Sequence, residues 1–189
     1  MPLTPAAVRR ILLSVTLGAV VAAPAVRAQS SAPAREMAPI AFIGFRAGAP
    51  LAEVRARVRE LDGRLRCDQS KADRRVSECR GTIVDPDLAG SVDLWLSAID
   101  DRAAVLTLSA DVEPDELDRW RSRLEEYGRV GAQVQGAQWM MQWVRQGRMA
   151  RLTWRVQRKE RVASVSLIDG GVLDGWGRER ARAAHGGSR

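Results

Sequence analysis

The chain has 189 residues, of which 46% are hydrophobic and 28% are charged, and its formal net charge is +7. This length and apolar content suit one globular domain with its own core. Without the two ends, residues 1–28 and 178–189, the chain has 23 basic and 22 acidic side chains. A nearly neutral central domain argues against nucleic acid as a partner.

The first 28 residues have the three parts of a cleavable export signal. Arg9 and Arg10 give the positive start, residues 11–26 are apolar and uncharged, and residues 26–28 read Val-Arg-Ala, a small-x-small cleavage site. The apolar stretch has 16 residues, fewer than the roughly 20 that span a bilayer. We therefore expect cleavage after Ala28, no stable membrane anchor, and a periplasmic or secreted protein. The arginine pair keeps both general secretion and twin-arginine export open.

A single domain is predicted between a flexible leader and a basic tail. Residues 29–39 are rich in Ser, Ala and Pro, and residues 178–189 are rich in Arg, so we expect the first to be flexible and the second to be disordered. The domain at residues 40–177 divides into two repeats, at about 40–110 and 111–177.

Two amphipathic helices carry the repeat pattern, one from Pro50 to about Asp62 and one from Pro114 to about Tyr127. Each has apolar residues at spacings of 3, 4 and 3, which places them on one helical face. The corresponding apolar residues lie 66 positions apart, as in an internal repeat. These pairs are Leu51 and Leu117, Val54 and Trp120, Val58 and Leu124, and Leu61 and Tyr127.

Segments with strand-like alternation follow each helix. They are 64–69, 75–84, 91–99 and 103–110 after the first helix, and 138–146, 149–158 and 161–168 after the second. Short polar turns at Asp100-Asp101 and at residues 146–148 predict antiparallel hairpins. The predicted fold class is α+β: two α-β-β-β repeats form one antiparallel sheet, with both helices packed on one face.

The only two cysteines, Cys67 and Cys79, are expected to form one disulfide in an oxidising compartment. A pair of thiols or half of a metal site are the alternatives. Zinc needs about four N or S ligands, and the single histidine, His185, lies far away in the tail. We therefore predict no metal site and no cofactor.

Residues 45–54, with the sequence FRAGAPLAEV, resemble the turn and helix that open small exported α/β repeat domains. Such domains include the outer-membrane assembly lipoprotein family and β-lactamase inhibitor proteins. The resemblance rests on Gly48, the helix start at Pro50, Glu53-Val54 and the Cys-containing hairpin that follows. It implies a binding module whose open sheet face holds a partner protein. The cysteine that would carry the lipid is absent here, unlike in the assembly family.

The sequence offers few groups for catalysis. The only histidine, His185, is expected to be solvated in a Gly-rich tail, so a Ser or Cys nucleophile would have no base, and we predict no catalytic residues. Carboxylates are abundant from Asp85 to Asp118, and a carboxylate-dependent glycan hydrolase is therefore one alternative function. An envelope structural or assembly protein is the other. Asp is also a common turn and cap residue, which explains the same carboxylates without catalysis.

Arginine and tryptophan cluster in the second half of the chain. Residues 145–161 contain six arginines and one lysine against a single glutamate, and Trp139, Trp143 and Trp154 lie just before or among them. Alternation places Leu152, Trp154 and Val156 on the core face and Arg151 with Arg155 on the open face. The predicted binding residues are Trp95, Trp139, Trp143, Arg151 and Arg155.

Arginine stacked on tryptophan suits a protein carboxylate or a glycan. The predicted partner is therefore an envelope or secreted protein, with a glycan as the alternative. In a second interpretation, the aliphatic parts of the arginine side chains only cover the outer face of the sheet and bind no partner. In a third interpretation, the acidic and basic blocks pair within the fold or across a homodimer.

Overall fold

The computed structural model describes residues 38–84, 90–157 and 160–186. The predicted signal peptide, nearly all of the predicted leader, and Asp85 to Ala89 lie outside the described residues. The described elements follow one another in the order β1 (Ala41–Phe42), β2 (Phe45–Arg46), α1 (Leu51–Glu60), β3 (Arg64–Gln69), β4 (Val76–Val84), β5 (Ser91–Ile99), β6 (Arg102–Asp111), α2 (Pro114–Leu124), the 3-10 turn η1 (Glu125–Tyr127), β7 (Gln133–Gln135), β8 (Gln138–Arg145), β9 (Arg148–Gln157), β10 (Glu160–Asp169) and α3 (Gly170–Gly186).

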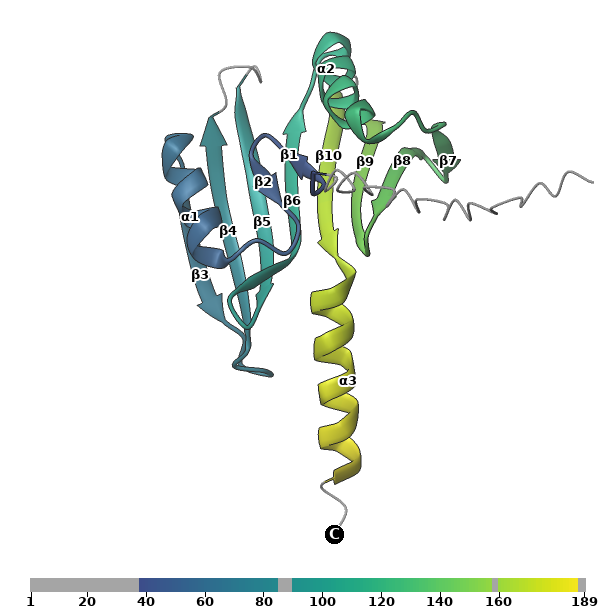
Figure 1. The fold of residues 1–189 in the computed structure, drawn as a ribbon. Helices are drawn as coiled ribbons and strands as arrows, with labels where there is room; N and C mark the ends of the chain where they lie inside the picture. The colour runs from purple at the N-terminus through teal and green to yellow at the C-terminus, as the bar shows by residue number, and fades with distance from the viewer. Residues whose placement is uncertain (1–37, 85–89, 158–159, 187–189) are drawn as a thin grey trace, which may run out of the picture. The chain divides into compact units, whose positions relative to one another are not determined.

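Eight strands form one antiparallel sheet in the order β3-β4-β5-β6-β10-β9-β8-β7, and β1 and β2 form a separate hairpin. The α+β class and the antiparallel sheet are therefore confirmed. Each group of four strands is a meander, and the two meanders join through their last strands, β6 and β10. Figure 1 shows the two groups on either side of this junction.

The predicted tight turns are present. Asp100 and Asp101 join β5 to β6 with φ of 47° and 58°, and Gln146 and Gly147 join β8 to β9 with φ of 50° and 73°. Two central residues with positive φ are the pattern of a type I′ turn, whose twist matches paired strands. These turns fix the register of both hairpins.

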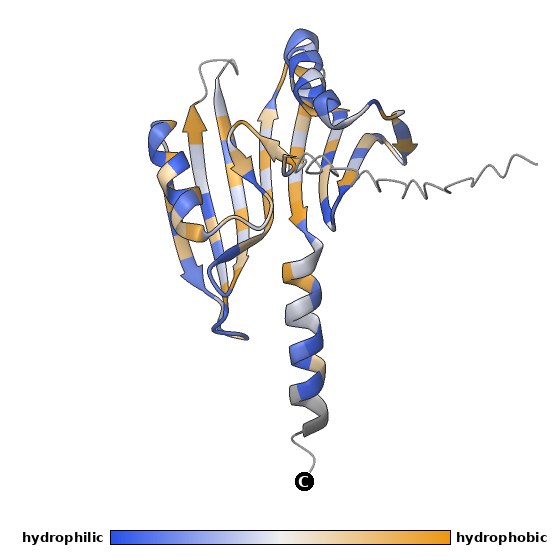
Figure 2. Cartoon of the chain, viewed as in Figure 1, coloured by the Kyte–Doolittle hydropathy of each residue, from blue (hydrophilic) through white to orange (hydrophobic). Residues whose placement is uncertain are grey.

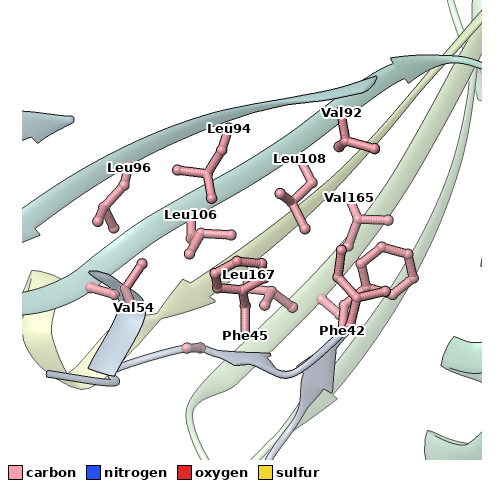
Figure 3. Packing of buried hydrophobic residues seen from close by; sticks show 14 of the residues in the cluster. Phe42, Phe45, Val54, Val92, Leu94, Leu96, Leu106, Leu108, Val165 and Leu167 are labelled. Carbon is pink, nitrogen blue, oxygen red and sulfur yellow. The ribbon is translucent and has the colours of Figure 1, made fainter. Parts of the chain in front are cut away.

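The core lies on one face of the sheet. Alternate residues of the central strands are buried there, and the buried residues of α1 and α2 belong to the same cluster. Figure 3 shows Phe42 and Phe45 of the β1–β2 hairpin against this layer of leucines and valines. Figure 2 shows hydrophobic and hydrophilic residues alternating along these strands. Both helices therefore pack on one face, as the sequence predicts.

Helix α2 is fastened to the β1–β2 hairpin. Trp120 packs edge-on against Phe42 with ring centroids 5.3 Å apart. The Tyr127 hydroxyl accepts from Ala41 N at 2.9 Å and donates to Ala41 O at 3.2 Å. Burial, chiefly, raises the pKa of Tyr127 to about 12, so this hydroxyl keeps its proton at neutral pH.

The C-terminal segment differs from the sequence prediction. Helix α3 runs from Gly170 to Gly186, so residues 178–186 are helical where a disordered tail was expected. Asp169 begins the helix: its Oδ1 accepts from Val172 N at 3.0 Å and its Oδ2 from Arg148 Nε at 2.9 Å. A carboxylate at this position stabilises a helix N-terminus. The glycines in the first turn concealed this start, because glycine pairs usually mark turns.

Two contacts tie α3 to the turn between β3 and β4. Trp176 Nε1 donates to Asp73 Oδ2 at 2.8 Å, and Arg75 forms an ion pair with Glu179. Arg75 also pairs with Asp73 at 3.4 Å. The hydrogen bond from Trp176, followed by those from the Arg75 main chain and side chain, lowers the pKa of Asp73 from 3.8 to about 2.

We expect the attachment of α3 to weaken as pH falls from about 4 to 2. A carboxylate whose folded pKa is depressed stabilises the fold above its unfolded pKa and loses that contribution on protonation through its folded pKa. The indole N–H signal of Trp176 in NMR spectra should shift over this range. Asp73→Asn, which removes the titrating group, should abolish this transition; an unchanged transition in that variant would contradict the assignment to Asp73.

Candidate functional site

The face of the sheet opposite the core carries a continuous row of polar side chains. Strand pairing aligns one residue from each of seven strands in this row, because directly opposite residues share a face. Helices α1 and α2 bury their apolar residues in the core on the opposite face. In sheet order the row contains Arg66, Arg80, Trp95, Thr107, Ser166, Arg151 and Gln142.

Hydroxyl groups line the junction of the two meanders. Thr107 Oγ1 and Ser166 Oγ are 2.9 Å apart, and Ser109 Oγ and Ser164 Oγ are 2.8 Å apart. The two hydroxyl groups of each pair share one hydrogen bond, and each hydroxyl oxygen can still accept another. The middle of this face is therefore polar and uncharged, with arginines on either side of it.

A groove of about 770 Å³ lies on the part of this face formed by β3 to β6. Arg64, Arg66 and Arg80 line it together with Trp95, which is 38% exposed. Thr82, Asp93 and Asp62 complete its polar wall. The groove thus combines an aromatic surface with three guanidinium groups.

The side chains of these three arginines form no hydrogen bond or ion pair with any other described residue. Arg66 and Arg80 lie directly opposite each other on β3 and β4, and Arg64 lies two residues along on the same face. Like charges in directly opposite positions destabilise a sheet. An anion bound between them would relieve this repulsion, and guanidinium groups match carboxylate geometry well.

The five predicted binding residues do not form one site. Trp95, Arg151 and Arg155 belong to the open face, as predicted, but Trp95 and Arg151 are three strands apart, or about 14 Å at a strand spacing of about 4.8 Å. With the Gln142 amide oriented to satisfy both groups, its oxygen accepts from Arg151 Nε at 2.8 Å and Nη2 at 2.9 Å. Arg151 is therefore already held by a neighbour.

Trp143 and Trp139 lie on the covered face, which corrects their predicted placement. Trp143 is opposite Ala150 and only 2% exposed, and its Nε1 donates to Gly128 O at 2.7 Å. Trp139 stacks on Trp154 with ring centroids 6.1 Å apart and is 46% exposed at the margin of the core. Because alternate residues of β8 share a face, both tryptophans lie on the core face. The sequence prediction had placed them on the open face.

The groove arginines were not among the predicted binding residues, although the sequence contains a signal for them. Residues 64–69 read Arg-Leu-Arg-Cys-Asp-Gln, in which charged and less polar residues alternate. Once Cys67 is placed in the core by its disulfide to Cys79, Arg64 and Arg66 must point to the other face. The prediction favoured the arginines of residues 145–161 instead, because basic residues are denser there.

The described residues contain no group of three His, Cys, Asp or Glu side chains placed to hold a metal ion. Among the described helices, none is both long and apolar enough to cross a bilayer. No protein-family model, curated protein or solved structure matches the chain. The geometry of the open face is therefore the basis for a functional proposal.

Proposed function

We propose that this chain is an exported, non-enzymatic binding module that recognises a protein partner in the cell envelope through the open face of its sheet. The observation that carries the proposal is the row from Arg66 to Arg151 across the uncovered face, with the groove at one end. A wide polar face with exposed arginine and tryptophan suits protein recognition, because these residue types are enriched where binding energy concentrates.

Export is supported by the pattern of residues 1–28 and by the disulfide. The Cys67–Cys79 bond suits an oxidising space such as the periplasm or the exterior. The same bond removes both thiols from consideration as nucleophiles. With His185 as the only histidine, the proposal includes no catalytic site.

A two-repeat architecture is part of the proposal. The sheet order is symmetric about the β6–β10 junction, and each half begins with a helix and continues as a four-strand meander. The offset of 66 residues between the apolar faces of α1 and α2 supports the same division. Each half therefore has four strands. The fourth strand of the second half, β7, was not among the three segments expected after α2, because it is short and its three residues are exposed.

An affinity capture from cell-envelope extract tests the proposal. The test variant combines Trp95→Ala with Arg151→Ala, which removes two anchors of the open face. The matched control combines Trp139→Ala with Arg59→Ala, which removes the same residue types from the covered side. We expect wild type and control to retain a common partner and the test variant to lose it.

Circular dichroism and thermal unfolding establish that each variant is folded before capture. Equal capture by the two variants would contradict recognition through the open face. If the captured protein is the same chain, the binding partner would be a second copy of it. Selective capture of a polysaccharide by wild type would favour the glycan alternative.

A further inference from the structure

Strand β3 ends the sheet, so one side of its main chain has no partner strand. Cys67 and Cys79 are directly opposite, and their Cα atoms are 4.0 Å apart, the short spacing of a non-hydrogen-bonded pair. The two kinds of pair alternate in an antiparallel ladder. Leu65, Cys67 and Gln69 therefore direct their N–H and C=O groups away from β4, toward the outer edge.

The intervening side chains supply a charge pattern along the same edge. Arg64 and Arg66 lie on the open face, two residues apart, and both are exposed. Neither side chain has an ion-pair or hydrogen-bond partner among the described residues, and Arg80 lies behind Arg66 on β4. Asp68, the next residue on this face, reverses the charge and sits opposite Glu78.

We propose that β3 binds an extended acidic segment of a partner protein, which adds to the sheet as a ninth strand. This inference rests on the proposed function and names the chemistry that one end of the open face recognises. Strand addition satisfies the outer main-chain groups of β3. It places alternate side chains of the segment beside Arg64 and Arg66, at the separation of directly opposite residues.

The charge pattern selects both the class of ligand and its register. Two carboxylates separated by one residue match Arg64 and Arg66, while a third carboxylate at the next alternate position would meet Asp68 and Glu78. The site therefore favours acid-x-acid with a non-acidic residue at the next alternate position on the Asp68 side, and the repulsive position limits binding in other registers. A glycan carries carboxylates too but has no peptide groups to pair with Leu65, Cys67 and Gln69.

The test uses the full chain with its disulfide formed and three capped octapeptides. One has acidic residues alternating with threonine, Thr-Glu-Thr-Glu-Thr-Thr-Thr-Thr; the second has Gln in place of Glu; the third has both Glu residues adjacent. Titration calorimetry at low salt compares their affinities, and oligogalacturonate serves as the glycan probe. We expect the first peptide to bind about tenfold more tightly than the second and third, from two cross-strand charge pairs.

Two further measurements locate the site. Arg64→Gln with Arg66→Gln should weaken binding of the first peptide about tenfold, whereas Arg55→Gln with Arg59→Gln, an equal charge change on α1, should leave it unchanged. Hydrogen exchange at the Leu65, Cys67 and Gln69 amides should slow on binding. Equal losses from the two double variants, unprotected edge amides, preferential binding of oligogalacturonate, or no binding of any peptide would each overturn strand addition at β3. Because the capture experiment alters Trp95 and Arg151 only, recognition through the open face can survive such a result.

Discussion

Trp143→Ala is expected to lower the free energy of unfolding strongly rather than to remove a binding contact. The side chain is 2% exposed, and its loss leaves a cavity beneath β8 and an unpaired carbonyl at Gly128. Truncating a buried Trp costs about 3–5 kcal/mol, a large part of the roughly 5–15 kcal/mol that stabilises a domain. Denaturant unfolding followed by circular dichroism measures this loss.

Trp139→Ala is the matched control, because Trp139 is on the same strand and face but 46% exposed. Its unfolding midpoint should move much less than that of Trp143→Ala. A variant at Trp143 with nearly wild-type stability would contradict its assignment to the core. A binding defect measured for Trp143→Ala alone would report on folding, which is why the capture experiment leaves this residue intact.

Removal of the disulfide by Cys67→Ala with Cys79→Ala should also destabilise the domain strongly. The cysteines are 12 positions apart, and the chain-entropy model gives about 3 kcal/mol for a loop of this size. For a domain of this length, that loss lowers the melting temperature by roughly 6–12 °C. Differential scanning calorimetry of the oxidised protein and the double variant measures the difference.

Reduction of wild type with dithiothreitol supplies the control for cavity effects of the alanine substitutions. Reduced wild type and the double variant should melt at similar temperatures. The contrary result is that reduction leaves the melting temperature of wild type unchanged although the double variant melts at a lower temperature. That result would assign the lost stability to packing around Cys79, which is fully buried, and not to the cross-link.

Much of the fold was predictable because its signals are local. The apolar spacing from Leu51 to Leu61 specifies a helical face, and alternation from Val92 to Ala98 specifies a half-buried strand. The Asp100-Asp101 turn allows only adjacent antiparallel pairing. The short strand β7 could not be found in this way, because Gln133 to Gln135 present no buried face.

The site was harder to predict because it depends on which face each strand turns to the core. The two tryptophans of β8 lie four residues apart and so share one face of the strand, but the sequence fits either orientation of that face. Only tertiary packing places Trp143 beneath Gly128. A shift of one residue exchanges the two faces of a strand, so the predicted face was wrong for both tryptophans of β8 together. Arg151 was placed on the correct face because Leu152 and Trp154 fix the orientation of β9.

The junction between β6 and β10 has a consequence for how the chain folds. The sheet is completed by pairing residues 105–111 with residues 162–168, so the two halves meet only after most of the chain is available. Contacts at such long sequence separation slow folding. During synthesis, β6 remains an unpaired edge until β10 has emerged, and in that interval the growing chain is most exposed to aggregation.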